Sequence, residues 1–281
     1  MRDLSIGILQ GNFRSSFDEK LAHVRAVADL VPEMRDADFA HNMSVLKRLA
    51  REAAKQGAQL TVTSESFRDG WSANAGTIER TATPIPGPVT DELCDLSREL
   101  QLWLCAGLFE LAGDRIYNSA VLISADGQLA GVYRKTHETK DVLLRMPYTL
   151  GDELPVFDSP WGTIGMLICH DRWYPENART LARRGAKIVL NPTATAVFHP
   201  KAEYFDIHRC VLRSQAYLNQ LWWVSCNAGN HGAHSVIVNP RGDILGAAGD
   251  GEQVLVTRLP IGSIEGYDFR SNVRDAAVYA S

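Results

Sequence analysis

The stretch Gly162-Thr-Ile-Gly-Met-Leu-Ile-Cys169-His-Asp-Arg-Trp-Tyr-Pro175-Glu176 decides both the fold and the chemistry expected of this chain. Its apolar half is typical of a buried strand, and Pro175 followed by Glu176 is a normal start for a helix. Cys169 therefore lies at a sharp turn between a strand and a helix. Backbone N–H groups and the positive helix end near such a turn favour a thiolate, so a nucleophilic cysteine is one interpretation that the spacing leaves open. An inert core cysteine is the alternative.

Strand-like runs and helix-like stretches alternate along the rest of the chain, with two short turns among them. Asp38–Gln56 places apolar side chains on one stripe, and Gly57 offers a stop. Asp-Gly within Ser124–Gly127 and Pro-Arg-Gly within Asn239–Asp243 are suitable turn sequences for hairpins. Hairpins mixed with strand–helix–strand units favour an α/β fold of two mixed sheets with helices outside. The strand-like runs are Leu4–Gln10, Gln59–Thr63, Leu102–Phe109, Tyr117–Ser124, Gln128–Arg134, Thr163–Cys169, Lys187–Asn191, Leu221–Cys226, Ser235–Val238 and Gln253–Thr257, and the other helix-like stretches are Thr90–Leu100, Pro175–Arg184 and Glu203–Leu218.

Composition and charge indicate an ordinary globular chain. With 45% hydrophobic and 22% charged residues, no repeat and no linker, the 281 residues are expected to form a single domain, 1–281. The formal net charge of -4 gives no global attraction to nucleic acid or to an anionic membrane. The five cysteines show no disulfide framework, and no signal peptide or membrane-spanning segment stands out. We therefore expect a cytoplasmic protein that binds neither nucleic acid nor membrane.

Histidine and metal-site patterns offer no competing chemistry. Because adjacent residues of an extended segment point to opposite faces, His170 should not meet Cys169 side to side. His231 and His234 lie in a Gly/Asn-rich loop, which suits a solvated or turn role better than metal binding. The sequence contains no HExxH, CxxC pair, GxSxG or GxxxxGK[ST] motif. A metal site, a serine-triad hydrolase and a nucleotide-binding protein are therefore disfavoured, and no metal is expected.

Two other strand ends carry unusual charges. Gln59–Glu65 is an apolar strand that ends in a carboxylate, and Gln128–Lys135 is a strand that ends in a basic pair. Either one alone is what the solvated rim of a sheet normally shows. Together with the turn at Cys169, they form a three-part pattern that is much more specific than any one of its parts.

With these three motifs the sequence resembles the nitrilase superfamily, also called carbon–nitrogen hydrolases, over nearly the whole chain. Glu65 in SESF, Lys135 in YRKTH and Cys169 in ICHDRWYPE look like the family's glutamate, lysine and cysteine. GAKIVLNPTAT follows the cysteine at the family's spacing, and GAHSVIVNPRGDILGAAGDGEQVLV is similar to the family's late strands and hairpin. The resemblance implies a four-layer αββα sandwich, no cofactor, and commonly a homodimer or a larger homo-oligomer.

The chemistry that the resemblance implies is hydrolysis of a non-peptide carbon–nitrogen bond through a cysteine thioester. Glu65 would take the proton of Cys169, and Lys135 with the backbone N–H after the cysteine would stabilise the oxyanion. Ammonia or an amine would leave with a proton from Glu65, and water activated by the same carboxylate would hydrolyse the thioester. Because one carboxylate serves as base and acid, we expect burial to bring its pKa toward neutrality.

The sequence departs from the family pattern in two places. Counting back from Gly151–Asp152, Leu144 stands where many members carry a second glutamate that orients the lysine and the substrate. Glu138 and Glu153 are candidate replacements, but neither is in register. The segment Phe13–Arg35 is longer than the family's usual first connection, and it either covers a site or decorates an edge. The missing glutamate leaves a catalytically impaired relative open as an alternative.

The turn after the nucleophile looks closer to the N-carbamoyl-amine and N-carbamoyl-amino-acid amidohydrolase branches than to aromatic nitrilases. In branches that cleave carbamoyl amino acids, an arginine at the place of Arg172 holds the substrate carboxylate, for which a guanidinium is suited. The alternative for Arg172 is a pair with a neighbouring acid. Further substrate contacts are expected from His170, Trp173, Asn191, Phe198 and His199.

Three functions remain open at this stage. The first is an amidase or carbamoylase that acts on a small linear amide or carbamoyl compound. The second is a nitrilase that converts a nitrile into an acid and ammonia. The third is a non-catalytic or acyl-binding relative in which the change at Leu144 has removed turnover.

Overall fold

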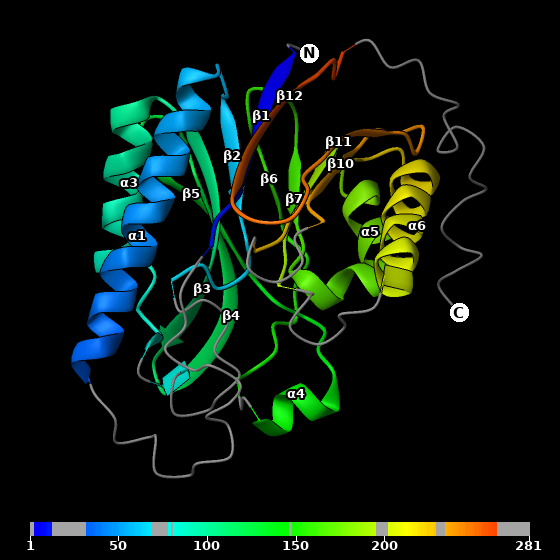
Figure 1. Ribbon diagram of the computed structural model, residues 1–281. Coiled ribbons are helices and arrows are strands. Elements are labelled where there is room, and N and C mark those ends of the chain that lie inside the picture. Colours follow the sequence, from blue (N-terminus) through cyan, green and yellow to red (C-terminus); the bar gives the residue numbers. More distant parts are fainter. Residues whose placement is uncertain are drawn as a thin grey trace.

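The computed structural model describes residues 3–12, 32–68, 78–79, 81–145, 148–194, 202–228 and 234–262. Two six-stranded sheets lie face to face, and helices cover the outer face of each (Figure 1). The four-layer αββα sandwich expected from the resemblance is therefore confirmed. Within the described part of the chain, no helix is long and apolar enough to cross a membrane.

The first sheet carries two of the three charged or nucleophilic strand ends. Its middle strand β2 pairs in parallel with both neighbours, and the strands beyond them pair antiparallel, with a tight turn at Ser124–Gly127 as expected. β2 and β5 consequently run in the same direction and end at the same edge of the sheet. The strands in spatial order are β12 (Gln253–Leu259), β1 (Leu4–Gln10), β2 (Leu60–Thr63), β3 (Trp103–Ala112), β4 (Arg115–Ile123) and β5 (Leu129–Arg134).

The second sheet repeats this design. Its strands β7, β8 and β9 are parallel, and antiparallel strands flank them on both sides. The turn at Asn239–Asp243 joins β10 to β11, as the sequence predicts. The strands in spatial order are β11 (Ile244–Ala247), β10 (Val236–Val238), β9 (Trp222–Cys226), β8 (Ile188–Pro192), β7 (Ile164–Met166) and β6 (Val156–Phe157).

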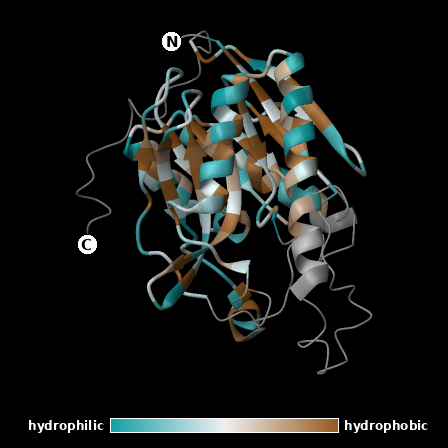
Figure 2. Cartoon of the chain, turned by 90° about the vertical axis from the view of Figure 1, so that its left-hand side faces the viewer, coloured by the Kyte–Doolittle hydropathy of each residue, from teal (hydrophilic) through white to brown (hydrophobic). Residues whose placement is uncertain are grey.

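The helices cover the sheets in two pairs. In Figure 1, α1 (Pro32–Lys55) and α3 (Pro88–Leu100) lie on the first sheet, and α5 (Pro175–Arg183) and α6 (Ala202–Asn219) lie on the second. The predicted apolar stripe of α1 is buried, because Leu46 and Ala53 are both 0% exposed. Figure 2 shows the strands as largely hydrophobic, while the helices in front of them carry hydrophilic segments. Each helix thus buries one face, as expected for an outer layer.

The core lies mainly between the two sheets. The largest cluster of buried apolar residues draws on both of them, for example Ile6 and Val62 from the first and Ile188 and Val224 from the second. Strands covered on both faces must be apolar almost throughout, and this explains the unbroken hydrophobic runs in the sequence. The shared core agrees with one domain, which remains a prediction for the full range 1–281.

Some predicted boundaries differ from the observed ones. The first long helix begins at Pro32 and not at Asp38, and the predicted strand Thr163–Cys169 ends at Met166. The strand is shorter because the chain turns into a 3₁₀ helix, Cys169–Trp173. The sequence also gave no sign of the short helix α4 (Lys140–Arg145) or of β6. Of the segment Phe13–Arg35, residues 13–31 lie outside the described residues, and Pro32–Arg35 belong to α1.

Candidate active site

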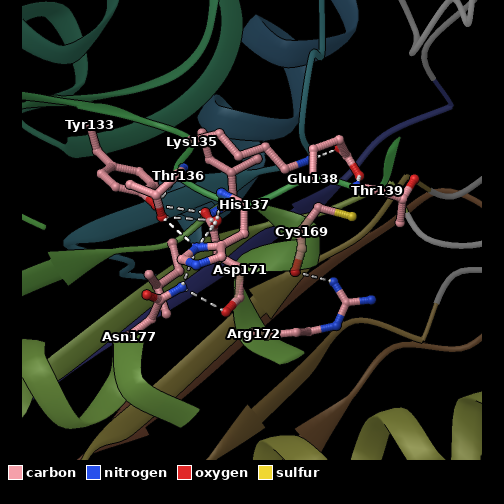
Figure 3. A network of polar contacts seen from close by, with 12 residues as sticks. Tyr133, Lys135, Thr136, His137, Glu138, Thr139, Cys169, Asp171, Arg172 and Asn177 are labelled. Atoms are coloured by element: carbon pink, nitrogen blue, oxygen red, sulfur yellow. Dashed lines mark hydrogen bonds and ion pairs between the residues drawn. The ribbon is translucent and has the colours of Figure 1, made fainter. Parts of the chain in front are cut away.

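Three strand ends bring Glu65, Lys135 and Cys169 into one cluster. Lys135 Nζ lies 2.9 Å from Glu65 Oε1, and the two side chains are 1% and 0% exposed. Both groups act electrostatically on the thiol of Cys169. The close-up in Figure 3 shows Lys135 and Cys169 in the same group of side chains. The three-part pattern of the sequence is therefore one site in space.

Glu65 is held at a turn immediately after β2. Ser66 adopts a left-handed conformation with φ of 49°, and the N–H of Glu65 donates at 3.3 Å to the carbonyl oxygen of Thr193, the residue after β8 of the second sheet. Glu65 Oε1 also accepts a hydrogen bond of 2.7 Å from Asn118 Nδ2. A Cβ on Gly107 would lie 2.9 Å from Glu65 Cα, so the close approach of β3 requires a glycine. The backbone around the carboxylate is thus fixed from both sheets.

The two oxygens of the Glu65 carboxylate have different surroundings. Oε1 accepts from Lys135 and Asn118, whereas Oε2 is buried and has no hydrogen-bond partner among the described residues. A buried acceptor without a donor is costly unless a function uses it. Oε2 is therefore the available acceptor for a proton from a neighbouring group.

Lys135 is fixed by its backbone on both sides. Its N–H donates to Asn118 O and its carbonyl accepts from the N–H of Gly151, each at 2.8 Å. A Cβ on Gly151 would lie 2.5 Å from the carbonyl oxygen of Arg134, so only a glycine permits this approach. The ammonium group consequently has a defined position inside the cluster.

A second carboxylate, that of Glu138, also contacts the lysine. Glu138 Oε2 lies 2.5 Å from Lys135 Nζ, and the Glu138 side chain is 5% exposed. Leu144, by contrast, is 74% exposed on α4. Glu153 is exposed and lines a cavity of about 410 Å³ with Arg134, on another side of β5. Of the two candidate replacements for the missing glutamate, Glu138 is the one at the lysine.

The chain turns sharply at Cys169. The residue has a positive φ of 43°, and its carbonyl accepts a hydrogen bond of 2.6 Å from Arg172 Nη1. The same nitrogen donates to Thr193 Oγ1 at 2.9 Å. A non-glycine residue in this conformation is strained, and such strain is frequent at functional sites. The predicted sharp turn is confirmed.

The predicted preference of Cys169 for the thiolate is wrong. Burial raises the pKa of the thiol above its ordinary value, and the negative charge of Glu65 raises it further, while Arg172 and Lys135 oppose the change. The helix begins at Pro175 as predicted, but the 3₁₀ helix Cys169–Trp173 separates its N-terminus from the sulfur. Cys169 would therefore need a base in order to act as a nucleophile.

The pKa values of the two carboxylates in the cluster shift in opposite directions. Burial raises the pKa of Glu65, and the charge of Glu138 raises it further against the opposing effect of Lys135. For Glu138, burial acts in the upward direction, but Lys135 and the hydrogen bonds together lower the pKa. Burial acts to lower the pKa of Lys135, but the surrounding anionic groups, Glu65 first, raise it well above normal. The pKa is thus raised for Glu65 and lowered for Glu138, and the role of Glu65 as the base remains a prediction.

Asp171 is a structural member of the site that the sequence did not single out. Its carboxylate accepts hydrogen bonds from the backbone N–H groups of Ile168 and His137, both at 2.8 Å, and from Tyr133 Oη at 2.7 Å. Figure 3 shows this network linking the segment after Lys135 to the turn at Cys169. The sequence shows only an acidic residue two positions after Cys169. Its partners Tyr133 and His137 are distant in the sequence, so its role could not be predicted from a short window.

The remaining predicted contacts are dispersed. Asn191 is 0% exposed, donates to Leu167 O and accepts from Ser225 Oγ, so its amide is bonded within the protein. His170 and Trp173 are partly buried; the ring of His170 packs edge-on against Tyr174 at 5.7 Å. The Arg172 guanidinium lies 5.2 Å from the centre of the Trp173 ring. Phe198 and His199 lie outside the described residues.

Comparisons with known proteins find related sequences over most of the chain. A family model described as carbon–nitrogen hydrolase matches residues 25–269. N-carbamoylputrescine amidase of Solanum lycopersicum is 31% identical over 252 residues, which cover 81% of this chain and 84% of the relative. A nitrilase of Pyrococcus abyssi is 31% identical over 238 residues, covering 81% and 86%.

Solved structures show the same fold. An amidase from Nesterenkonia sp. AN1, in a mutant form with the acetamide moiety of fluoroacetamide added covalently to its active-site cysteine, superposes with a TM-score of 0.76. The similarity covers 98% of this chain and 95% of that chain at 22% sequence identity. This likeness supports the arrangement of layers and strands, independently of the sequence motifs.

Proposed function

Because the chain belongs to the carbon–nitrogen hydrolase family, whose members include amidases, we propose that it cleaves a small amide or N-carbamoyl compound through a thioester on Cys169. The observation that carries the proposal is the buried contact of 2.9 Å between Lys135 Nζ and Glu65 Oε1 beside the strained turn at Cys169. A base, a cation and a nucleophile in one buried cluster are the parts that acyl transfer requires.

In the first half of the proposed reaction, Glu65 Oε2 takes the proton of the Cys169 thiol as the sulfur attacks the carbonyl carbon. Lys135 and the backbone N–H of His170 stabilise the negative charge that develops on the carbonyl oxygen. The carbon–nitrogen bond then breaks, and the proton held by Glu65 goes to the departing nitrogen. The products are an acyl-thioester on Cys169 and ammonia or an amine.

In the second half, water hydrolyses the thioester. Glu65, which is ionised again, takes a proton from the water as its oxygen attacks the acyl carbon. The bond from carbon to sulfur breaks, and the proton on Glu65 returns to the sulfur of Cys169. The raised pKa of Glu65 suits a group that gains and loses a proton in each half of the cycle.

We favour an uncharged amide or an N-carbamoyl amine over an N-carbamoyl amino acid. Arg172, the residue expected to hold a substrate carboxylate, is 1% exposed. One of its terminal nitrogens is already bonded to the carbonyl of Cys169 and to Thr193. This geometry supports a role for Arg172 in shaping the nucleophile turn. The similarity to an N-carbamoylputrescine amidase supports the same choice.

The test is ammonia release on a panel of simple amides, N-carbamoyl amines, N-carbamoyl amino acids and aliphatic nitriles. Wild type is compared with Cys169→Ala and with Cys210→Ala, which removes an exposed cysteine as a matched control. We expect release from amides or carbamoyl amines that vanishes only in Cys169→Ala. Release from nitriles alone would establish the nitrilase alternative. No release from any compound would favour the impaired relative.

Assembly as a homodimer or a larger homo-oligomer remains a prediction, as does the cytoplasmic location. Sedimentation equilibrium of the purified chain tests the assembly, since the monomer has a mass of 31.0 kDa. A single species at that mass across the micromolar range would contradict it.

A further inference from the structure

Hydrogen bonds and an ion pair fix both oxygens of the Glu138 carboxylate, although the family resemblance does not predict a glutamate at this position. Besides its contact with Lys135, Glu138 Oε2 accepts a hydrogen bond of 2.8 Å from Tyr148 Oη. Glu138 Oε1 accepts a hydrogen bond of 2.8 Å from the backbone N–H of Thr139. With both oxygens bonded and little exposure, the carboxylate has one orientation, and its charge is directed at the lysine (Figure 3).

We propose that Glu138 is the second carboxylate of this active site and acts as a positioning residue that holds Lys135 in place. Glu138 lies three residues after the lysine, whereas the family pattern leads to a glutamate at position 144. The inference rests on the proposed function and deepens it, since it assigns separate tasks to the two carboxylates that contact one lysine. It also removes the main reason to regard the chain as catalytically impaired.

The structure provides a reason why position 144 is not needed. Leu144 is on the solvent side of α4, and a side chain that is 74% exposed does not reach a lysine that is 1% exposed. The neighbouring Leu143 packs against a buried apolar cluster that includes Tyr148. The inner side of α4 therefore supports the tyrosine that holds Glu138, and the charge itself comes from the loop after β5.

The charges that face one another explain why two carboxylates are useful. Lys135 faces Glu65, Glu138, Tyr148 and the thiol of Cys169, and Glu138 also acts on His170. If Glu65 were the only anion at the lysine, its protonation in the reaction would leave the buried ammonium without a counter-ion. A buried charge without a partner is strongly destabilising. Glu138 remains ionised and supplies that partner throughout the cycle.

A charge-removing substitution separates this role from a purely structural one. Glu138→Gln keeps the size of the side chain and removes the negative charge, and its one amide oxygen can replace only one of the two carboxylate oxygens that accept from Tyr148 and Thr139. Glu153→Gln is the matched control, because Glu153 is exposed and lines a different cavity. We expect kcat/KM to fall about 100-fold in Glu138→Gln, by analogy with loss of one oxyanion-stabilising group, and to change less than about twofold in the control.

The pH dependence of kcat/KM distinguishes the positioning role of Glu138 from a purely structural one. The charge of Glu138 raises the pKa of both Glu65 and Cys169. Its removal should therefore move the acid limb of kcat/KM to lower pH. An activity loss with an unmoved limb would overturn the proposal in favour of a structural role. Glu138→Asp, which keeps the charge, should recover part of the activity and the wild-type limb.

A second pair of variants tests the location of the carboxylate. Adding Leu144→Glu to Glu138→Gln should restore nothing, because position 144 is exposed. Restored activity would overturn the proposal, since it would show that position 144 serves the lysine.

Alkylation by iodoacetamide at varied pH, with the modified cysteine identified by mass spectrometry, keeps the test independent of turnover. In Glu138→Gln the pH midpoint for Cys169 should shift downward even if wild type hydrolyses none of the compounds tried. A shifted midpoint with an inactive wild type would therefore refute the proposed function alone, and an unshifted midpoint would refute the role of Glu138.

Discussion

Arg134 and Lys135 are consecutive basic residues at the end of β5, yet their surroundings are opposite. Arg134 is 40% exposed, pairs with Glu110 at 2.6 Å and lies over the ring of Tyr117 at 4.0 Å. Lys135 is 1% exposed and lies between Glu65 and Glu138. Successive residues of an extended strand point to opposite faces, so one step along the chain separates the two environments.

Both residues form ion pairs, but Lys135 and its two carboxylates are all buried, whereas Arg134 is 40% exposed. Water reaches the guanidinium of Arg134 and weakens its attraction to Glu110, although that carboxylate is itself only 4% exposed. Around Lys135 the charges are removed from water and shift the pKa of one another. The protonation state of one group then affects the pKa of the others, and in the proposed reaction this coupling lets Glu65 hold a proton in one step and release it in the next.

The largest effect is expected from Lys135→Met. The substitution leaves Glu65 and Glu138 buried without their shared cation, and breaking such a buried pair costs about 3 to 5 kcal/mol of unfolding free energy. Loss of the oxyanion partner should also reduce kcat/KM by about 1000-fold. Urea unfolding and ammonia release measure the two effects. A variant with near-normal activity would show that the lysine has no part in the reaction.

Asp171→Asn should have the next largest effect, because Asp171 anchors both the segment after Lys135 and the turn at Cys169. The carboxylate accepts from two backbone N–H groups and from Tyr133, and an amide nitrogen cannot accept from any of them. We expect a loss of about 2 to 3 kcal/mol in unfolding free energy. Activity should fall because the nucleophile turn and the lysine segment share this anchor. Unchanged stability in urea would contradict the assigned anchoring role.

The pH dependence of wild type sharpens the comparison further. Because Glu65 has a raised pKa, it is protonated in the folded state at pH values where it ionises in the unfolded chain. Between the two pKa values its contribution to stability therefore falls as pH rises, whereas kcat/KM rises as the base ionises. Activity should fall about tenfold per pH unit below this pKa. An acid limb at the pKa of an ordinary exposed glutamate would argue against Glu65 as the base.

The smallest effect is expected from Arg134→Met on the other face of the strand. Glu110 is buried but keeps a hydrogen bond from Ser119 Oγ, so we expect a loss of about 1 to 2 kcal/mol in unfolding free energy and activity within about threefold of wild type. The same assays that measure Lys135→Met measure this variant. Equal effects of the two substitutions would remove the distinction drawn between the two faces.

The sequence predicted the features that depend on local pattern. The unbroken apolar runs indicate strands buried on both faces, and the charged ends after two of them located Glu65 and Lys135. Pro175 indicated the helix after the nucleophile. These signals are local because strand burial and helix starts depend on residues close together in the chain.

Features that depend on distant contacts were missed or predicted wrongly. Asn118 contacts Glu65 from 53 residues away, and His137 contacts Asp171 from 34 residues away, so neither pattern is visible in a short window. The pKa of Cys169 was predicted in the wrong direction because burial and the charge of Glu65 outweigh the nearby cations. Alignment with the family pattern placed the second glutamate at position 144, which is Leu144 in this chain, whereas the fold brings Glu138 to the lysine.

In the proposed reaction, Cys169 carries a thioester that Glu65 and Lys135 help to form and hydrolyse. The most direct test is mass spectrometry of the protein quenched during turnover of a simple amide, comparing wild type with Cys169→Ala, alongside ammonia release. We predict an acyl adduct on Cys169 of wild type that disappears once substrate is exhausted, and neither adduct nor ammonia in the variant. Ammonia release at the wild-type rate by Cys169→Ala would contradict the account.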